Sequence, residues 1–360
     1  MKQHKASPSR LDLSLQAFFP RRSTAWLSRK GQPSKVPTRQ ILVLWMVATL
    51  GVMGIACGDG APIAPEELAV VNLGEWKVEV EAWHQDRIQR LEDREGWLSL
   101  AGLFWLQEGE HSFGSGEEAA LKFPAVAPEL AGSLRLEAGE VTLIPPAEGS
   151  SGEEGEQAAA LTIDGEVVTE PVTLASDAAE EATTVALGPL RFFVIDREGQ
   201  LGVRLKNRER EIFDVFDGIP RFPMDPQWRI VARWEAFEEP KTLEIPNVLG
   251  GVFEESSPGA AVFEIDGQEY RLEPTGSPDD ELFFVFGDTT NGKSTYGGGR
   301  FLYAGPPQDG WIVLDFNRTY SPPCTFSPYA TCPLARPEAK LPIAVEAGEL
   351  LWDGYKTFAY

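Results

Sequence analysis

The pattern of hydrophobic and polar positions in this 360-residue chain changes near residue 95. From Glu75 to about Arg94, large and mostly apolar residues recur at intervals of three and four, the spacing of one face of an α-helix. The pattern predicts one amphipathic helix that ends before Gly96. The residues of this stripe are Trp76, Val80, Trp83, Arg87, Ile88 and Leu91.

Beyond this helix, short apolar segments separated by turn residues predict antiparallel β-strands. Two hairpins turn at Asp164-Gly165 and Asp266-Gly267, because a glycine tolerates the positive φ of a two-residue turn. A third hairpin joins residues 191–195 to 201–206 through Asp196-Arg197-Glu198-Gly199. The register predicted for the hairpin at Asp266-Gly267 pairs Phe263 with Tyr270 and Ile265 with Gln268.

Repeated short strands without intervening helices predict a mainly β fold. We expect the helix and a sandwich-like first β domain over residues 75–222, followed by a second β domain, a sandwich or barrel, over 223–360. Pro220, Pro223 and Pro226 mark the boundary, since proline interrupts strand pairing. The acidic, small-residue stretch 145–160 predicts a disordered loop within the first domain.

The first residues of the chain predict an export signal. A sixteen-residue, mostly apolar stretch, Ile41 to Ala56, follows Arg39 and leads into Gly54-Ile55-Ala56-Cys57, as in a bacterial lipoprotein signal. We expect residues 1–56 to be removed, Cys57 to be lipidated and 57–74 to form a tether to the envelope. An uncleaved signal anchor is the alternative, and both export the remainder. Translation from near Val36 is a hypothesis that would explain the long basic start.

Removing the signal makes the chain more acidic. Residues 1–56 hold nine of the 32 Lys and Arg and one of the 55 Asp and Glu, which leaves 23 basic and 54 acidic residues and a net charge of −31. Such a surface repels phosphate backbones, so we expect no nucleic-acid partner. It favours solubility, a cationic partner or a salty habitat.

Two cysteines remain beyond Cys57. In an oxidising compartment, Cys324 and Cys332 are predicted to form a disulfide worth about 2–3 kcal/mol by chain-entropy estimates. A metal pair is the rival interpretation, yet neither His84 nor His111 has metal-ligand spacing to them. Both histidines are predicted to be surface or half-buried polar residues. We therefore expect no bound metal.

One motif imitates a nucleotide site. Gly287 to Ser294 has the glycine, lysine and serine spacing of a phosphate loop, after an apolar strand. A phosphate loop also needs a following helix, and Thr295-Tyr296-Gly297-Gly298-Gly299 cannot start one. We therefore predict a turn with Lys293 in solvent, no nucleotide and no cofactor.

The most concentrated polar chemistry follows the apolar strand 311–314. If the strand is central in its sheet and continues, Asp315 and Asn317 lie on one face, and Phe316 and Arg318 on the other. The charged cluster needs partners, for which Arg300, Glu346 and Glu349 are candidates, and we expect the two-cysteine loop to cover it. Either a buried Asp–Arg network holds the loop, or the cluster is a ligand or catalytic site.

Several segments resemble domain-of-unknown-function family 1684 (DUF1684) of bacteria and archaea. The likeness extends over residues 75–352 and departs at Ala339, where many members have Asn. The segments that carry it are Glu95 to Leu106, Gly292 to Leu302, Asp315 to Arg318, Pro322 to Cys324, Ala330 to Pro333 and Glu346 to Glu349. The first β region also resembles a forkhead-associated sandwich, a fold-level analogy only. The family name implies no activity.

These observations predict an envelope-anchored binding or structural module. The alternative is an extracytoplasmic hydrolase of glycans or esters that uses paired carboxylates about 5–10 Å apart across an open cleft. A module would instead have these residues tied into arginine pairs. The candidate ligand or polar-network residues are Asp288, Tyr296, Arg300, Asp315, Asn317, Arg318 and Glu349.

Overall fold

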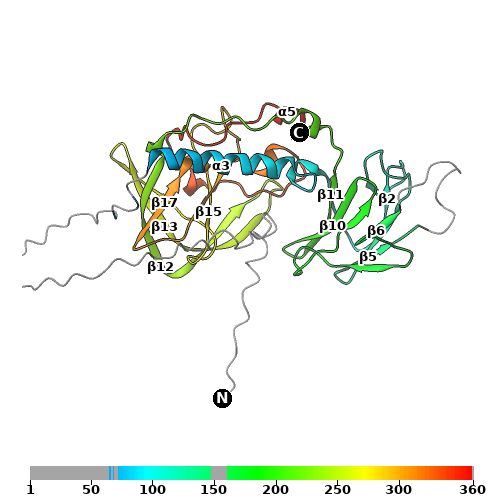
Figure 1. The fold of residues 1–360 in the computed structure, drawn as a ribbon. Coiled ribbons are helices and arrows are strands. Elements are labelled where there is room, and N and C mark those ends of the chain that lie inside the picture. Colours follow the sequence, from blue (N-terminus) through cyan, green and yellow to red (C-terminus); the bar gives the residue numbers. More distant parts are fainter. Residues whose placement is uncertain (1–64, 66–67, 69–71, 147–159, 359–360) are drawn as a thin grey trace, which may run out of the picture.

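The computed structural model describes residues 65, 68, 72–146 and 160–358. Two β regions lie end to end, and helix α3 (Leu73–Glu92) lies along one of them (Figure 1). Strands β1 to β11 form the first β region, and β12 to β17 form the second. The predicted mainly β fold is confirmed. The predicted signal, Cys57, most of the tether, and residues 147–159 of the predicted loop lie outside the described residues.

Helix α3 begins two residues before its predicted start. The side chain of Asn72 caps it by accepting hydrogen bonds from the backbone N–H groups of Gly74 and Glu75. Its buried face consists of Trp76, Val80, His84, Arg87 and Leu91. We predicted this helix as part of the first β domain, but its buried polar side chains contact the second β region, as described below. Within the described residues, no helix is long and apolar enough to cross a membrane.

The first β region is a sandwich of two sheets. One sheet has the order β1-β11-β10-β9-β6-β7, and the other β3-β2-β4-β5-β8. The first sheet comprises β1 (Leu100–Trp105), β6 (Leu161–Ile163), β7 (Glu166–Val167), β9 (Val185–Leu187), β10 (Leu190–Arg197) and β11 (Gln200–Asn207). The second comprises β2 (Gly109–Gly114), β3 (Leu121–Lys122), β4 (Gly132–Glu137), β5 (Glu140–Ile144) and β8 (Val172–Leu174).

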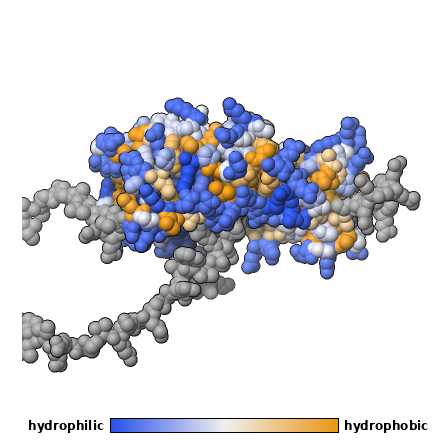
Figure 2. All heavy atoms as spheres, turned by 45° about the horizontal axis from the view of Figure 1, so that its top comes forward, coloured by the Kyte–Doolittle hydropathy of each residue, from blue (hydrophilic) through white to orange (hydrophobic). Residues whose placement is uncertain are grey.

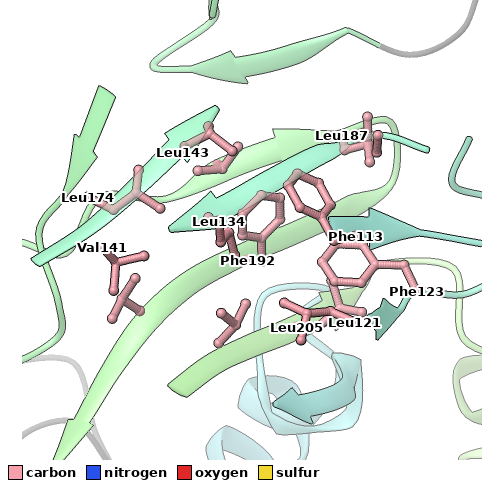
Figure 3. Close-up of a cluster of buried hydrophobic side chains, with 14 of the residues drawn as sticks. Phe113, Leu121, Phe123, Leu134, Val141, Leu143, Leu174, Leu187, Phe192 and Leu205 are labelled. Atoms are coloured by element: carbon pink, nitrogen blue, oxygen red, sulfur yellow. The ribbon is translucent and has the colours of Figure 1, made fainter. Parts of the chain in front are cut away.

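Both sheets contribute side chains to one apolar core (Figure 3). Phe113 of β2 meets Phe192 of β10 edge to face, with ring centroids 5.3 Å apart. Leu134 and Leu143 from one sheet and Leu205 from the other are fully buried. This burial of alternate positions explains why the strand pattern is visible in the sequence.

Two of the predicted hairpins occur as expected, and one is tighter. Asp164 and Gly165 have φ of 53° and 83°, and Thr162 pairs with Val167. The turn between β10 and β11 has two residues, Glu198 and Gly199, rather than the four predicted, because both adopt positive φ and Arg197 still pairs with Gln200.

The second β region contains a sheet of order β14-β13-β12-β17 and a separate pair of strands. The sheet comprises β12 (Arg229–Pro246), β13 (Val252–Ile265), β14 (Gln268–Leu272) and β17 (Trp311–Asp315), and the pair is β15 (Leu282–Phe286) with β16 (Arg300–Ala304). The predicted pairing of Phe263 with Tyr270 and of Ile265 with Gln268 is confirmed. Strand β17 is the last strand of its sheet rather than a central one, since it pairs only with β12.

Short helical turns carry the chain between and after the sheets. Between β11 and β12 lie α4 (Ile212–Val215) and a 3₁₀ turn, Pro226–Trp228. Further 3₁₀ turns are Trp97–Ser99, Phe316–Arg318, Pro323–Thr325 and Pro337–Ala339, and α5 (Tyr355–Phe358) is the last helix described. The segment after β17 therefore lies as irregular chain against the second sheet, where Val345 and Ala347 join its core.

Candidate functional site

The seven candidate residues do not form one cluster. The structure divides the charged ones among three places: an ion pair of Arg300 with Asp288, a polar group around Asp315, and an ion pair of Glu349 with Arg87. Tyr296 lies apart from these carboxylates, in an aromatic cluster where its ring is 5.7 Å from that of Tyr355. We predicted Arg300 as a partner of Asp315, but it pairs with Asp288 instead. Glu346 is exposed.

The first of these places is a fully buried ion pair. Arg300 begins β16, and its Nη2 donates to Asp288 Oδ2 at 2.7 Å, with both side chains 0% exposed. The same guanidinium donates to the carbonyl oxygens of Val345 and Ala347. Burial lowers the pKa of Arg300, and Asp288 acts in the opposite direction. Arg300 thus fastens the C-terminal segment to β16.

The loop after Asp288 is held by hydrogen bonds among its own residues. Asp288 Oδ1 accepts the N–H of Thr290 at 2.8 Å, and the amide of Asn291 bonds the Asp288 N–H and the Tyr296 carbonyl. The side chain of Asn291 therefore occupies the inside of the turn. Residues 287–299 form turns rather than a helix, and Lys293 is exposed.

The second place lies at the end of β17, under α3. Asp315 Oδ2 accepts a hydrogen bond from Trp76 Nε1 at 2.8 Å. Its Oδ1 accepts the backbone N–H of Asn317 at 3.1 Å and the Asn317 side-chain amide at 3.0 Å. This capping turns the chain into a 3₁₀ turn, so the predicted strand alternation of residues 315–318 is wrong.

The neighbours of Asp315 differ in how firmly they are held. Asn317 also bonds the main chain of Asp225, accepting from its N–H and donating to its carbonyl, both at 2.9 Å. Arg318 is a third exposed, its Nε is 3.6 Å from Asp315 Oδ2, and its Nη2 is 3.4 Å from the exposed Glu79. Asn317 therefore links Asp315 to the main chain of Asp225, whereas Arg318 lies on the solvent side of Asp315.

The third place joins α3 to the C-terminal segment. Arg87 Nε donates to Glu349 Oε1 at 3.2 Å, with side chains 4% and 1% exposed. Glu349 Oε2 accepts the N–H of Ser321 at 2.7 Å, and Arg87 Nη2 donates to the Ser321 carbonyl at 2.9 Å. The guanidinium also lies 4.8 Å from the centre of the Tyr320 ring. Both charges are satisfied without solvent.

His84 lies beside this pair and was wrongly predicted to be at or near the surface. It is 5% exposed, and its Nδ1 has no hydrogen-bond partner in the structure. Burial lowers the pKa of His84, Glu349 opposes that effect, and Arg221 adds to it. His111 is half-buried on β2, where its Nε2 is 2.8 Å from the Gln107 carbonyl.

The predicted Cys324–Cys332 disulfide is not present in the structure, where both cysteines are buried free thiols. Their loop does not cover Asp315, because Trp76 of α3 occupies that position. The loop instead packs against Leu100, at the first strand of the other β region.

None of the seven candidate residues lines the shallow hollow of about 340 Å³ at the start of α3, which is bordered by Gly74, Glu75, Val78 and Glu79. In the part of the chain that the structure describes, no three His, Cys, Asp or Glu side chains are grouped to hold a metal ion. The arrangement holds segments together and offers no carboxylate without a donor in the candidate set.

Residues 214–350 match the model of a family described as "Protein of unknown function (DUF1684)". Over these residues the chain resembles the DUF1684 family. An uncharacterized protein of Haloarcula marismortui, from gene locus rrnAC0354 and solved by solution NMR, is 32% identical over 38% of this chain and 78% of that chain, with a TM-score of 0.33. The comparison with curated proteins gave no match.

The DUF1684 match covers the second β region and all seven candidate residues, whereas α3 lies before it. Trp76 and Arg87, which complete the sites of Asp315 and Glu349, are therefore outside the matched segment. Both belong to the predicted helical stripe, and an arginine among its apolar positions was the available signal. Periodicity places Arg87 on the buried face but does not identify Glu349 as its partner.

Proposed function

We propose that this protein is an exported, lipid-anchored binding or structural module of the bacterial cell envelope. The observation that carries the proposal is the pairing of Asp288, Asp315 and Glu349 with donors inside the protein. A module needs these residues to hold its segments in place, and an arginine or tryptophan donor does so for each one.

The hydrolase alternative has less support. It needs two carboxyl groups facing an open cleft, one of which can carry a proton to the leaving group. Asp288 is 0% exposed at its side chain and bound by a guanidinium, and Glu349 is 1% exposed and bound by another. Neither can reach a substrate without breaking its ion pair, and such pairs are costly to break.

Helix α3 gives the module its connection to the membrane. The predicted lipid site, Cys57, precedes this helix by a short tether, so any pull on the lipid reaches the body through α3. Trp76 near its start and Arg87 near its end bond the second β region through Asp315 and Glu349. These two contacts would keep the helix on the body when the tether is under tension.

The anchor is tested by labelling cells with a fatty-acid analogue. We expect label on the wild type and none on Cys57→Ser, which should accumulate as precursor or leave the membrane fraction. Cys324→Ser is the matched control and should keep the label. Label that persists on Cys57→Ser would contradict the lipoprotein assignment.

The choice between module and hydrolase is tested on the purified protein with chromogenic esters and glycosides. Trp76→Phe removes one donor from Asp315 and should lower the free energy of unfolding by about 1–3 kcal/mol. Wild-type turnover that Asp315→Asn abolishes and Trp76→Phe retains would favour the hydrolase. The absence of turnover, with reduced stability in both variants, supports the module.

A further inference from the structure

The loop between Cys324 and Cys332, here called the clasp loop, lies between the two β regions. On one side, Ser327 Oγ donates to the Leu100 carbonyl at 3.3 Å, and Arg204 Nη2 of β11 donates to Thr331 Oγ1 at 3.3 Å. On the other, the Val248 N–H donates to the Cys332 carbonyl at 3.1 Å. The shape of this loop therefore bears on the contact between the regions.

The two thiols are already adjacent. The backbone N–H of Cys324 donates to Cys332 Sγ at 3.2 Å, and the Cys324 thiol donates to the Ala330 carbonyl at 3.8 Å. Cys324 is 7% exposed and Cys332 0%. A disulfide requires two cysteines close together, and the contact of the Cys324 N–H with Cys332 Sγ places these two residues side by side.

A buried cation accompanies the thiols. Arg204 is 3% exposed, its Nε has no hydrogen-bond partner, and among the described residues it forms no ion pair with a carboxylate. Burial lowers the pKa of Arg204 to about 10. Burial likewise raises the pKa of Cys332, and Arg204 acts in the opposite direction. Burial has the larger effect, so the pKa of Cys332 lies well above its ordinary value and the guanidinium only partly opposes the shift; the thiolate is the form that attacks a disulfide.

We propose that Cys324 and Cys332 are a redox-responsive pair that fastens the first β region to the second when oxidised. The oxidant is a small disulfide. One cysteine thiolate attacks a sulfur of that disulfide, forms a mixed disulfide and releases one small thiol. The second cysteine thiolate then attacks the protein sulfur of the mixed disulfide and releases the second small thiol.

The products are one protein disulfide and two small thiols, so the small disulfide takes up both electrons and both protons. The bond fixes the ends of the clasp loop, whereas the reduced loop is held only by its hydrogen bonds and packing. Export would place the pair where such oxidants occur, but the pairing itself depends only on the contacts above and is tested without cells.

The first test equilibrates purified full-length Cys57→Ser protein, which has no third thiol, in mixtures of reduced and oxidised glutathione. Free thiols are trapped by alkylation and mapped by mass spectrometry. We expect Cys324 and Cys332 to become protected together, joined in one peptide pair. The proposal would be overturned if both thiols could still be alkylated after refolding in oxidised glutathione. It would also be overturned if one bound zinc ion protected both thiols from alkylation.

The second test measures amide hydrogen exchange in the oxidised protein, the reduced protein and the Cys324→Ser/Cys332→Ser variant. Reduction should increase exchange severalfold in β1 and β11, which contact the clasp loop, and leave β4 and β5 unchanged. The double variant should match the reduced protein. Changes confined to residues 320–333 would show that the bond does not couple the regions.

Arg204 is tested by the rate of oxidation as a function of pH. Arg204→Met should oxidise more slowly, and its rate should rise at higher pH than in the wild type, because the cation that favours the thiolate is gone. Arg204→Lys keeps the charge and should restore part of the rate. Equal pH profiles in all three proteins would remove Arg204 from the proposal.

Discussion

The interiors of the two β regions are stabilised by different interactions. The core of the first region consists of apolar side chains such as Phe113, Leu134 and Phe192 from facing sheets (Figure 3), and the buried Arg204 of β11 lies outside this core, against the clasp loop. The second region has an apolar core as well, but it also buries the charges of Arg300, Asp288 and Glu349. The face shown in Figure 2 has many hydrophilic residues, with hydrophobic ones among them.

This difference determines how each region responds to a change in one residue. When a side chain in an apolar core is shortened, some buried apolar surface is lost, but the neighbouring side chains remain in apolar surroundings. A buried ion pair leaves an uncompensated charge when either partner is removed. Removing one buried charged group from the second region should therefore lower its free energy of unfolding by more than the loss of one surface ion pair would.

The largest effect is expected from Arg300→Ala. It strands the carboxylate of Asp288 and should lower the free energy of unfolding by about 3–5 kcal/mol, measured by denaturant titration. Arg271→Ala, which breaks surface pairs with Glu235 and Glu273, is the control and should cost about 0–1 kcal/mol. Asp288→Leu combined with Arg300→Met should recover part of the loss. A cost for Arg300→Ala no larger than the control's would refute the contrast between the regions.

The matched change in the first region is Leu134→Ala. Leu134 is 0% exposed between the two sheets, and its truncation should cost about 2–5 kcal/mol through lost burial and the cavity left behind. Because no charge is stranded, the cost should be the same at low and high salt. A cost that changes strongly with salt concentration would show that electrostatics also matters in this core.

The sequence indicated the local elements of both regions more fully than the contacts between distant segments. The helix, the mainly β fold and the hairpins at Asp164 and Asp266 follow from local periodicity and turn chemistry. Among the hairpins, only the turn at Glu198 was predicted to be longer than it is. Such features depend on neighbouring residues, so a single chain is enough to recognise them.

Only part of the candidate site could be predicted, because the partners of its residues are distant in sequence. The residue types were correct, but Arg87 and Glu349 are 262 positions apart, and Trp76 and Asp315 are 239 apart. Nothing local distinguishes Arg87 from another helical arginine except its place in the apolar stripe. The sequence pattern of residues 311–318 looks like one continuous strand. The strand ends at Asp315, however, because the side chain of Asp315 accepts the N–H of Asn317.

His84 should make the contact of α3 with the second region depend on pH. Burial keeps its folded-state pKa below the ordinary value, so the unfolded chain takes up a proton first as the pH falls. The stability contributed by neutral His84 is fully present above about pH 6.5, its ordinary pKa, and is lost as the pH falls below that value. The free energy of unfolding should therefore decrease from pH 7 to pH 5.

The measurement is the difference in unfolding free energy between these two pH values. It should be reduced in His84→Gln and unchanged in His111→Gln, the control on the first region. Carboxylates whose pKa values are lowered, such as Glu273 and Glu235, lose their contribution below this window. An equal difference in the wild type and His84→Gln would assign the pH dependence to other groups.

The smallest effect is expected from Arg318→Ala, although this arginine is the nearest in sequence to Asp315. Asp315 keeps its bonds from Trp76 and from the backbone and side chain of Asn317, and water can reach the position that a third-exposed arginine vacates. We expect a loss below about 1 kcal/mol in thermal or denaturant unfolding. A loss as large as that of Arg300→Ala would mean that Asp315 depends on Arg318 for its charge balance, and that the edge of the network under α3 is as tightly coupled as its centre.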